Sequence, residues 1–226
     1  MVDWGDGTIN QERSHRYGDD INQDRVIVRI KGDIEQRYSE TSPSNDSKVT
    51  KVLQIGKHVI SCEDMFANCL ELTEIATNAF QYISDVIDYS GMFRGCKNLQ
   101  TIDEPLFRPN SKVKYISGMF KDCSALHTIP ENMFSGLKSL TGASRVFCGC
   151  IHLEGNVNGM FDGCVKLYRV SGLFKNCQSL HSPTKDMFSG CVSLEMVDDI
   201  FKNCSSENFN IIPEDLFSDC KKLVKG

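Results

Sequence analysis

The sequence predicts a β-rich α/β solenoid of about six 27-residue coils, with short strands and short helical turns, preceded by a small N-terminal β segment. Twelve of the 13 phenylalanines recur at alternating intervals of 14 and 13 residues, with a last interval of 16. The period is therefore 27 residues in two similar halves, and such units fill residues 49–226. A unit of this length cannot bury its own apolar side, whereas stacked units can. The recurring residues are Phe66, Phe80, Phe93, Phe107, Phe120, Phe134, Phe147, Phe161, Phe174, Phe188, Phe201 and Phe217.

Each half-coil carries a turn signal directly after its phenylalanine. The second residue after the phenylalanine is Gly, Asn or Asp in ten of twelve cases, as in Met119-Phe120-Lys121-Asp122-Cys123. These residues tolerate a positive φ, so we predict a short helical turn closed by a left-handed residue. Tyr82 and Pro109 are the exceptions, and the turn should differ there. Short apolar steps such as Leu126-His127-Thr128-Ile129 follow, and they predict short strands.

Nine of the 11 cysteines lie three residues after a recurring phenylalanine, in two columns. Ile83 and Leu137 replace cysteine at equivalent positions, which predicts that the columns point inward as free thiols filling core volume. Disulfides between adjacent coils stay open, because the spacing of paired strands falls within the distance a disulfide spans. A metal site lacks support, since there is no Cys-x-x-Cys. Cys62 and Cys148 lie outside the columns and are expected to be the more reactive thiols.

The chain before the repeats has a different pattern. We divide it into a β segment over 1–38, a polar Pro/Ser linker over 39–48 and the solenoid over 49–226. Strands are expected at 2–8 and at Val26–Ile30, and two or three strands need a partner surface or more chain. Asp3, Asp6, Asp19 and Asp20 suggest calcium, but the spacing of an EF-hand is absent and an aspartate-rich turn is the simpler interpretation.

Composition narrows the function classes. The 226 residues are 40% hydrophobic and 24% charged, as in folded proteins, and the net charge of −5 argues against a nucleic-acid binder. No apolar run reaches 18 residues and residues 1–20 do not form a signal peptide, so no membrane insertion is expected and any targeting segment is absent from this chain. No catalytic or cofactor-binding motif is present, which predicts a non-enzyme without cofactor or metal, most simply a monomer.

One column of polar residues is the candidate binding site. The residue after the conserved-spacing Leu of each coil is not part of the core, and ligands of repeat proteins usually meet such a face. His127, Glu154 and His181 would lie one coil apart and could form a polar cluster, although a solvated face without a ligand is the alternative. The column, called the polar column below, comprises Thr73, Gln100, His127, Glu154, His181 and Asn208.

The segment Phe120–Phe134, through Cys123, Leu126, Ile129, Pro130, Glu131 and Asn132, resembles the BspA-like leucine-rich repeats of bacterial surface proteins. Val2–Thr8, Tyr17 and Val26–Ile30 look like the later part of a PKD-like β-sandwich, and the pairing is similar to surface proteins of gut Bacteroidetes. The resemblance implies an exported, adhesin-like protein at the bacterial cell surface that binds a host extracellular or cell-surface protein or a glycan. A structural spacer projecting other domains is the alternative function.

Overall fold

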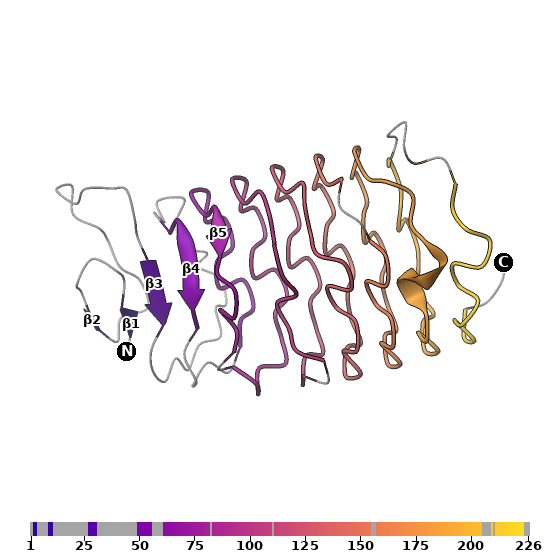
Figure 1. The fold of residues 1–226 in the computed structure, drawn as a ribbon, viewed down its shortest axis with the longest axis horizontal. Helices are drawn as coiled ribbons and strands as arrows, with labels where there is room; N and C mark the ends of the chain where they lie inside the picture. The colour runs from indigo at the N-terminus through magenta and orange to yellow at the C-terminus, as the bar shows by residue number, and fades with distance from the viewer. Residues whose placement is uncertain are drawn as a thin grey trace.

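The computed structural model describes residues 2–3, 9–10, 27–30, 49–55, 61–81, 83–109, 111–154, 157–204, 209 and 211–223. Over these residues the chain winds into successive coils that stack along one axis, from the N-terminal strands at one end to the C-terminal coil at the other (Figure 1). Parallel β-bridges join residues 27 apart, for example Tyr115 to Gly142 and Gly142 to Arg169. The repeat solenoid that the period predicts is therefore confirmed, while the number of coils stays a prediction.

A five-stranded sheet covers the N-terminal end of the solenoid, in the order β2-β1-β3-β4-β5. The strands β1 (Val2–Asp3), β2 (Ile9–Asn10) and β3 (Ile27–Ile30) precede the repeats, and β4 (Lys51–Gln54) and β5 (Glu74–Ile75) belong to them. β3 pairs in parallel with β4, so the sheet continues from the N-terminal segment into the first coil. The predicted strand at Val26–Ile30 is present as β3. Only part of the one expected at 2–8 is described, as β1, and the proposed 39–48 linker lies outside the described residues.

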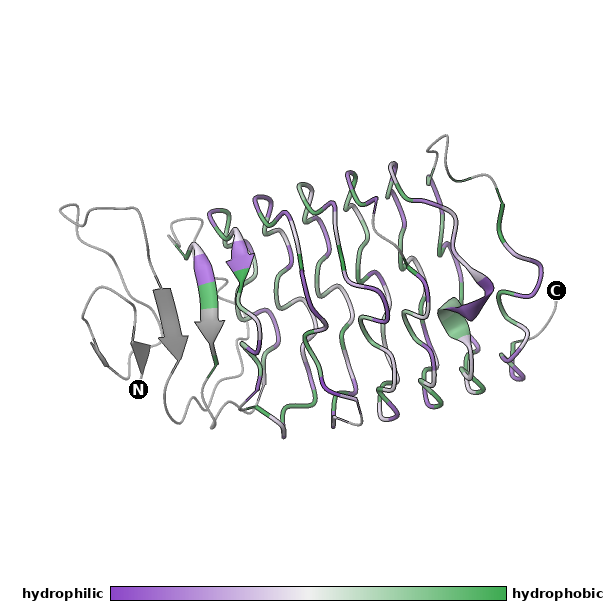
Figure 2. Cartoon of the chain, viewed as in Figure 1, coloured by the Kyte–Doolittle hydropathy of each residue, from purple (hydrophilic) through white to green (hydrophobic). Residues whose placement is uncertain are grey.

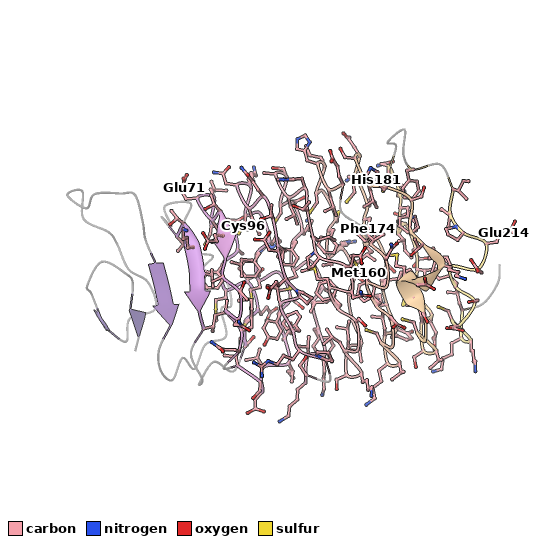
Figure 3. The ribbon with its side chains drawn as sticks, viewed as in Figure 1. Glu71, Cys96, Met160, Phe174, His181 and Glu214 are labelled. Atoms are coloured by element: carbon pink, nitrogen blue, oxygen red, sulfur yellow. The ribbon has the colours of Figure 1, made fainter. Side chains whose placement is uncertain are left out.

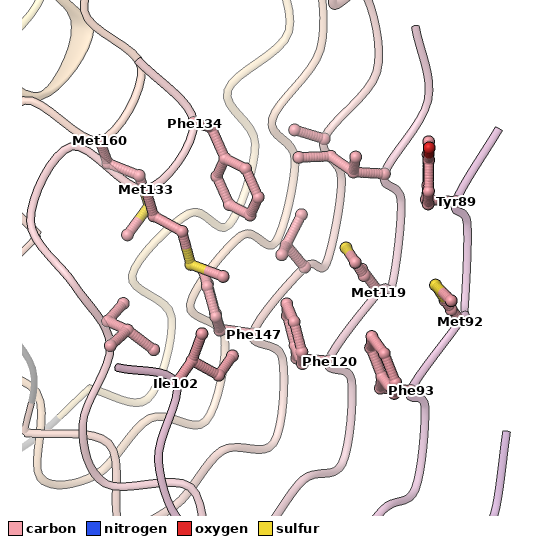
Figure 4. Packing of buried hydrophobic residues seen from close by; sticks show 14 of the residues in the cluster. Tyr89, Met92, Phe93, Ile102, Met119, Phe120, Met133, Phe134, Phe147 and Met160 are labelled. Carbon is pink, nitrogen blue, oxygen red and sulfur yellow. The ribbon is translucent and has the colours of Figure 1, made fainter. Parts of the chain in front are cut away.

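Two columns of stacked phenylalanine rings form the centre of the solenoid. Figure 2 shows apolar and polar residues alternating along the coils, and Figure 4 shows Phe93, Phe120 and Phe147 lying one behind another in successive coils. In this column the ring centroids of Phe93 and Phe120 are 5.5 Å apart, and those of Phe120 and Phe147 are 5.7 Å apart. The second column continues through Phe161 and Phe188, whose centroids are 5.7 Å apart. Because the rings are almost parallel, each coil buries its aromatic side on its neighbour.

The expected helical turns are wrong for most of the chain. The one helix among the described residues is the 3₁₀ helix η1 (Lys185–Phe188), and the other half-coils make single turns. The reason is a second left-handed residue, four positions before the predicted one. In one coil these two residues are Gly118 (φ 64°) and Asp122 (φ 61°), and they leave no room for a helix between them. The apolar steps likewise form mostly single bridges, rather than the short strands that the sequence predicts.

The predicted left-handed positions themselves are almost all confirmed. Nine of the ten Gly, Asn and Asp residues at the second place after a recurring phenylalanine have a positive φ, and Asp219 does not. Pro109 is not left-handed, as expected, and Tyr82 lies outside the described residues.

The cysteine columns point into the core, as predicted. All 11 cysteines are free, and ten of them are buried, with Cys204 half-buried. Each column thiol from the second coil onward lies against the coil before it, where, for example, Cys123 Sγ donates to the carbonyl oxygen of Phe93 at 3.1 Å and Cys150 Sγ to that of Phe120 at 3.1 Å. The thiol therefore packs like an apolar side chain and also satisfies a carbonyl that the phenylalanine stack encloses.

The expectation that Cys62 and Cys148 are the more reactive thiols is wrong. Cys62 is fully buried and Cys148 is 8% exposed. Burial raises the pKa of the Cys62 thiol, helped by the nearby carboxylate of Asp88, and burial also raises the pKa of Cys148. The thiolate is the nucleophile, so a raised pKa and low exposure make both thiols unreactive.

Candidate binding surface

The turns and ladders on the outside of the coils are the places where a ligand could meet this solenoid. Within the described part of the chain, no three His, Cys, Asp or Glu side chains come together as metal ligands, and no helix is long and apolar enough to cross a membrane. A shallow hollow between the first coils is lined by Ile75, Phe80, Ile102, Leu106 and their neighbours. Its lining offers no nucleophile paired with a base, so catalysis has no evident machinery there.

The structure places the polar column on adjacent coils at one edge. The backbone N–H of His127 donates to the carbonyl oxygen of Gln100 at 2.9 Å, and that of Glu154 to the carbonyl oxygen of His127 at 3.1 Å. Thr73, Gln100, Glu154 and His181 are exposed, His127 is half-buried, and Asn208 lies outside the described residues. Figure 3 shows His181 along the same upper edge of the solenoid as Glu71.

The polar cluster expected at the centre of this column is not built. His127 Nδ1 lies 3.2 Å from the carbonyl oxygen of Ala125 in its own turn, so the ring is held by its own coil. In the described part of the chain, the side chains of His127, Glu154 and His181 make no hydrogen bond or ion pair with one another. The column is therefore a row of separate polar side chains in register.

A second ladder runs along the other half of each coil and is the more regular of the two. Its backbone is joined at four successive junctions, where the N–H of one coil donates to the carbonyl of the coil before at 2.9–3.1 Å, from Lys114 to Ile87 at one end and from Glu195 to Tyr168 at the other. Parallel bridges run beside these bonds, from Asp88 through to Met196. We call it the aromatic ladder, made of Ile87–Asp88, Lys114–Tyr115, Thr141–Gly142, Tyr168–Arg169 and Glu195–Met196.

The aromatic ladder carries apolar surface that the core does not need. Ile87 is 38% exposed, Tyr115 43% and Tyr168 42%. Val165 and Val192, which are also exposed, lie three residues ahead of it in the turns that lead into it. The polar column has no comparable residue. An aromatic side chain left in water on a fold with a full core is a candidate contact for a partner.

The centre of the aromatic ladder is a gap with walls. Gly142 has no side chain there, and a Cβ at this position would lie 3.5 Å from Cδ1 of Tyr115. On the far side Arg169 turns away from the gap, since its Nη2 is 2.9 Å from Sδ of Met196 in the next coil. Tyr115 therefore presents one ring beside an open backbone position, a shape that accepts a planar or chair-shaped group.

Sequence reasoning missed the aromatic ladder, although a signal for it was present. Each coil has two similar halves, so the position after Leu153 in one half has an equivalent after Leu167 in the other. Following both positions through the repeats leads to Tyr168 and its neighbours as directly as to Glu154.

No family model matches the chain, and no curated protein matches it. Among solved structures the chain is similar to a leucine-rich repeat protein of T. pallidum, at 16% identity over 88% of this chain and 77% of that one, with a TM-score of 0.28. It is also similar to a leucine-rich repeat protein from Bacteroides ovatus, at 19% identity over 88% and 76%, with a TM-score of 0.26. A third is a leucine rich cell surface protein from Faecalibacterium prausnitzii, at 17% identity over 68% and 74%, with a TM-score of 0.16.

Proposed function

We propose that this chain is a non-catalytic leucine-rich-repeat binding module, exposed at a bacterial cell surface, whose aromatic ladder binds a host extracellular protein or a glycan. The exposed tyrosines of the aromatic ladder carry the proposal. A solenoid that served only as a spacer would be stable on its stacked core alone, and its surface could be polar throughout. Tyrosine is enriched at binding hot spots because it offers a large contact area and loses little conformational freedom.

The shape of the ladder supports a partner that extends along the solenoid axis. Tyr115 and Tyr168 belong to coils two steps apart, which at the spacing of paired strands corresponds to about 10 Å. An extended peptide or a chain of sugars can touch both rings and cross Gly142 between them. The PKD-like assignment of residues 1–38 and the surface location are part of the same proposal.

The first experiment is a saturation-binding screen of the purified chain against extracellular-matrix proteins, mucins and glycans. We expect a saturable partner, and we expect the double substitution Tyr115→Ser and Tyr168→Ser to weaken its binding tenfold or more, because hot-spot aromatics contribute about 2 kcal/mol or more each. Both side chains are exposed, so folding should be retained, as circular dichroism and the urea midpoint would verify.

The matched control is the triple substitution of His127, Glu154 and His181 by alanine in the polar column. It should leave both folding and binding unchanged if the aromatic ladder is the binding face. Loss of binding in the triple variant alone would assign the function to the polar column instead. A folded chain that binds nothing across the panel would favour the structural spacer.

A further inference from the structure

Five cations lie along one set of turns in a chain whose net charge is −5. The residue directly after a phenylalanine of the first column is a cation in four coils, and Arg145 lies two residues before Phe147 in the coil between them. The side chains are Arg94, Lys121, Arg145, Lys175 and Lys202. We call Lys121, Arg145 and Lys175, from three successive coils, the cationic turn.

Arg145 occupies a backbone position that disfavours it. Its φ is 57°, in the left-handed region, and the equivalent residues of the coils on either side are Gly118 and Gly172. A non-glycine residue in this region costs about 1–2 kcal/mol, and such strain concentrates at functional sites. Folding of this turn is served by glycine, so the presence of arginine needs another reason.

The neighbouring glycines make room for the arginine side chain. A Cβ on Gly172 would lie 3.3 Å from Cγ of Arg145 and 3.9 Å from Cβ of Lys175. On the other side, a Cβ on Gly118 would lie 3.8 Å from Cβ of Lys121. The guanidinium stem therefore lies across the next coil, close to the base of one lysine, with the second lysine one coil back.

The backbone holds these three coils in register. The N–H of Gly118 donates to the carbonyl of Ser144 at 2.8 Å, and the N–H of Arg145 to the carbonyl of Ser171 at 3.1 Å. Successive coils are about 4.8 Å apart at this kind of spacing. Lys121, Arg145 and Lys175 thus project from a rigid strip about 10 Å wide.

The charges of the lysines are partly balanced, whereas that of Arg145 is not. Lys121 Nζ is 3.5 Å from Oδ2 of Asp122, and Lys175 Nζ is 3.1 Å from Oδ2 of Asp199. Arg145 forms no ion pair or side-chain hydrogen bond within the described part of the chain. The cationic turn therefore keeps a net positive charge after its carboxylates are counted.

Carboxylates limit the positive strip at both ends. Asp64 pairs with Arg94 at 3.0 Å on the N-terminal side, and Asp199 accepts from both Lys175 and Lys202 on the C-terminal side. A long polyanion lying along the turns would meet these acids, whereas one anionic group centred on Arg145 would not.

We propose that the cationic turn binds a sulfate ester carried on a glycan, so that the ligand of the proposed binding module is a sulfated sugar chain. The proposal rests on the proposed function and names the chemistry of its ligand. A guanidinium donates two parallel hydrogen bonds to two oxygens of a tetrahedral oxyanion, and two ammonium groups beside it add charge-assisted bonds. Arg145 follows Gly142 of the aromatic ladder by three residues, so a sugar ring against Tyr115 and its sulfate near Arg145 draw on one continuous surface.

The test compares the full chain and its variants by calorimetry against a sulfated heparin hexasaccharide, the same hexasaccharide desulfated, and inorganic sulfate. Arg145→Gly is the informative variant, because glycine suits the left-handed backbone and folding should be unchanged or improved. We expect Arg145→Gly to weaken binding of the sulfated hexasaccharide at least fivefold. Lys138→Ala, which removes one exposed cation from a turn of the other half-coil, should change it less than twofold.

The remaining arms separate this inference from the proposed function. The desulfated hexasaccharide should bind at least tenfold more weakly than the sulfated one, and inorganic sulfate should bind more weakly than either variant of the intact site binds the hexasaccharide. Equal affinity of the two hexasaccharides, or an unchanged affinity in Arg145→Gly, would overturn the sulfate site. If a different partner from the screen still depended on Tyr115 and Tyr168, the binding module would stand without it.

Discussion

Left-handed residues decide the shape of each turn, and they occur at two places rather than one. Asn68, Asp122 and Asn176 occupy the place that composition predicts, while Asp64 and Arg145 occupy the place four residues earlier. In several turns the side chain of one coil fills the space that a glycine leaves in the next. Asp122 does this for Gly149, since a Cβ there would be 2.4 Å from Asp122 Oδ1.

Replacing Gly149 by alanine should therefore destabilise the protein by two separate effects. The positive φ of 81° costs about 1 kcal/mol for alanine relative to glycine, and the contact with Asp122 forces that side chain to move. Gly118→Ala is the matched control, because its φ is 64° and its nearest neighbour would be 3.8 Å away. Urea unfolding should show a larger loss for Gly149→Ala, and Asp122→Ala in the same chain should restore the difference. Equal losses at the two glycines would disprove the packing effect.

Buried thiols give the stability a dependence on alkaline pH. Burial raises the pKa of Cys123 and of Cys164 to about 12, and that of Cys204 and of Cys220 to about 11, from an ordinary value of 9.0. Above pH 9 the unfolded chain loses these protons while the folded chain keeps them, so the unfolded state is favoured as pH rises toward 12. At pH 8 and below, this contribution to stability is fully present.

The urea midpoint, measured under reducing conditions, should accordingly fall between pH 9 and pH 11. Lysines and tyrosines also titrate in this range, so the comparison is with the double variant Cys123→Ala and Cys164→Ala, whose midpoint should fall less steeply. The slopes are compared rather than the midpoints, because each alanine also removes packing. Parallel slopes in the two proteins would contradict a role for the buried thiols.

The phenylalanine stack is the unit of stability at the scale of elements. Each coil contacts only its neighbours, so a ring in the middle of the stack stabilises two junctions and a ring at the end stabilises one. Phe147 is fully buried, with ring centroids of Phe120 at 5.7 Å and Phe174 at 5.5 Å. Phe217 is only half-buried and stacks on Phe188 alone, at 5.4 Å.

Phe147→Ala should lower the free energy of unfolding by about 3–5 kcal/mol, because it removes a buried ring and leaves a cavity between two coils. Phe217→Ala should cost clearly less, since it opens the end of the stack to water instead of creating an enclosed cavity. Equilibrium urea unfolding followed by circular dichroism measures both. A loss at Phe217 as large as that at Phe147 would mean that stability does not depend on position within the stack.

At the scale of the whole molecule, the fold separates three kinds of surface. The polar column, the aromatic ladder and the cationic turn each recur at 27 residues, so stacking aligns each of them along the solenoid. The N-terminal strands add a further row of backbone pairing through β3 and β4, so β4 pairs on both sides, with β3 and with β5. A ligand therefore meets long parallel rows of side chains rather than a pocket, which is the geometry of repeat binding modules.

The sequence by itself determined the period, the inward direction of the phenylalanines and cysteines, and most of the left-handed turns. These follow from residue types whose chemistry is local or whose apolar surface must be buried, as with Phe120, Cys123 and Asp122. Tertiary structure decided which outer residues share a surface. Tyr115, Gly142 and Tyr168 are far apart along the chain, and only the register of the coils brings the two rings to either side of an open backbone position. The same register sets Arg145 between two glycines and two lysines, because hydrogen bonds between coils, and not the order of residues within one coil, determine what lies beside each side chain.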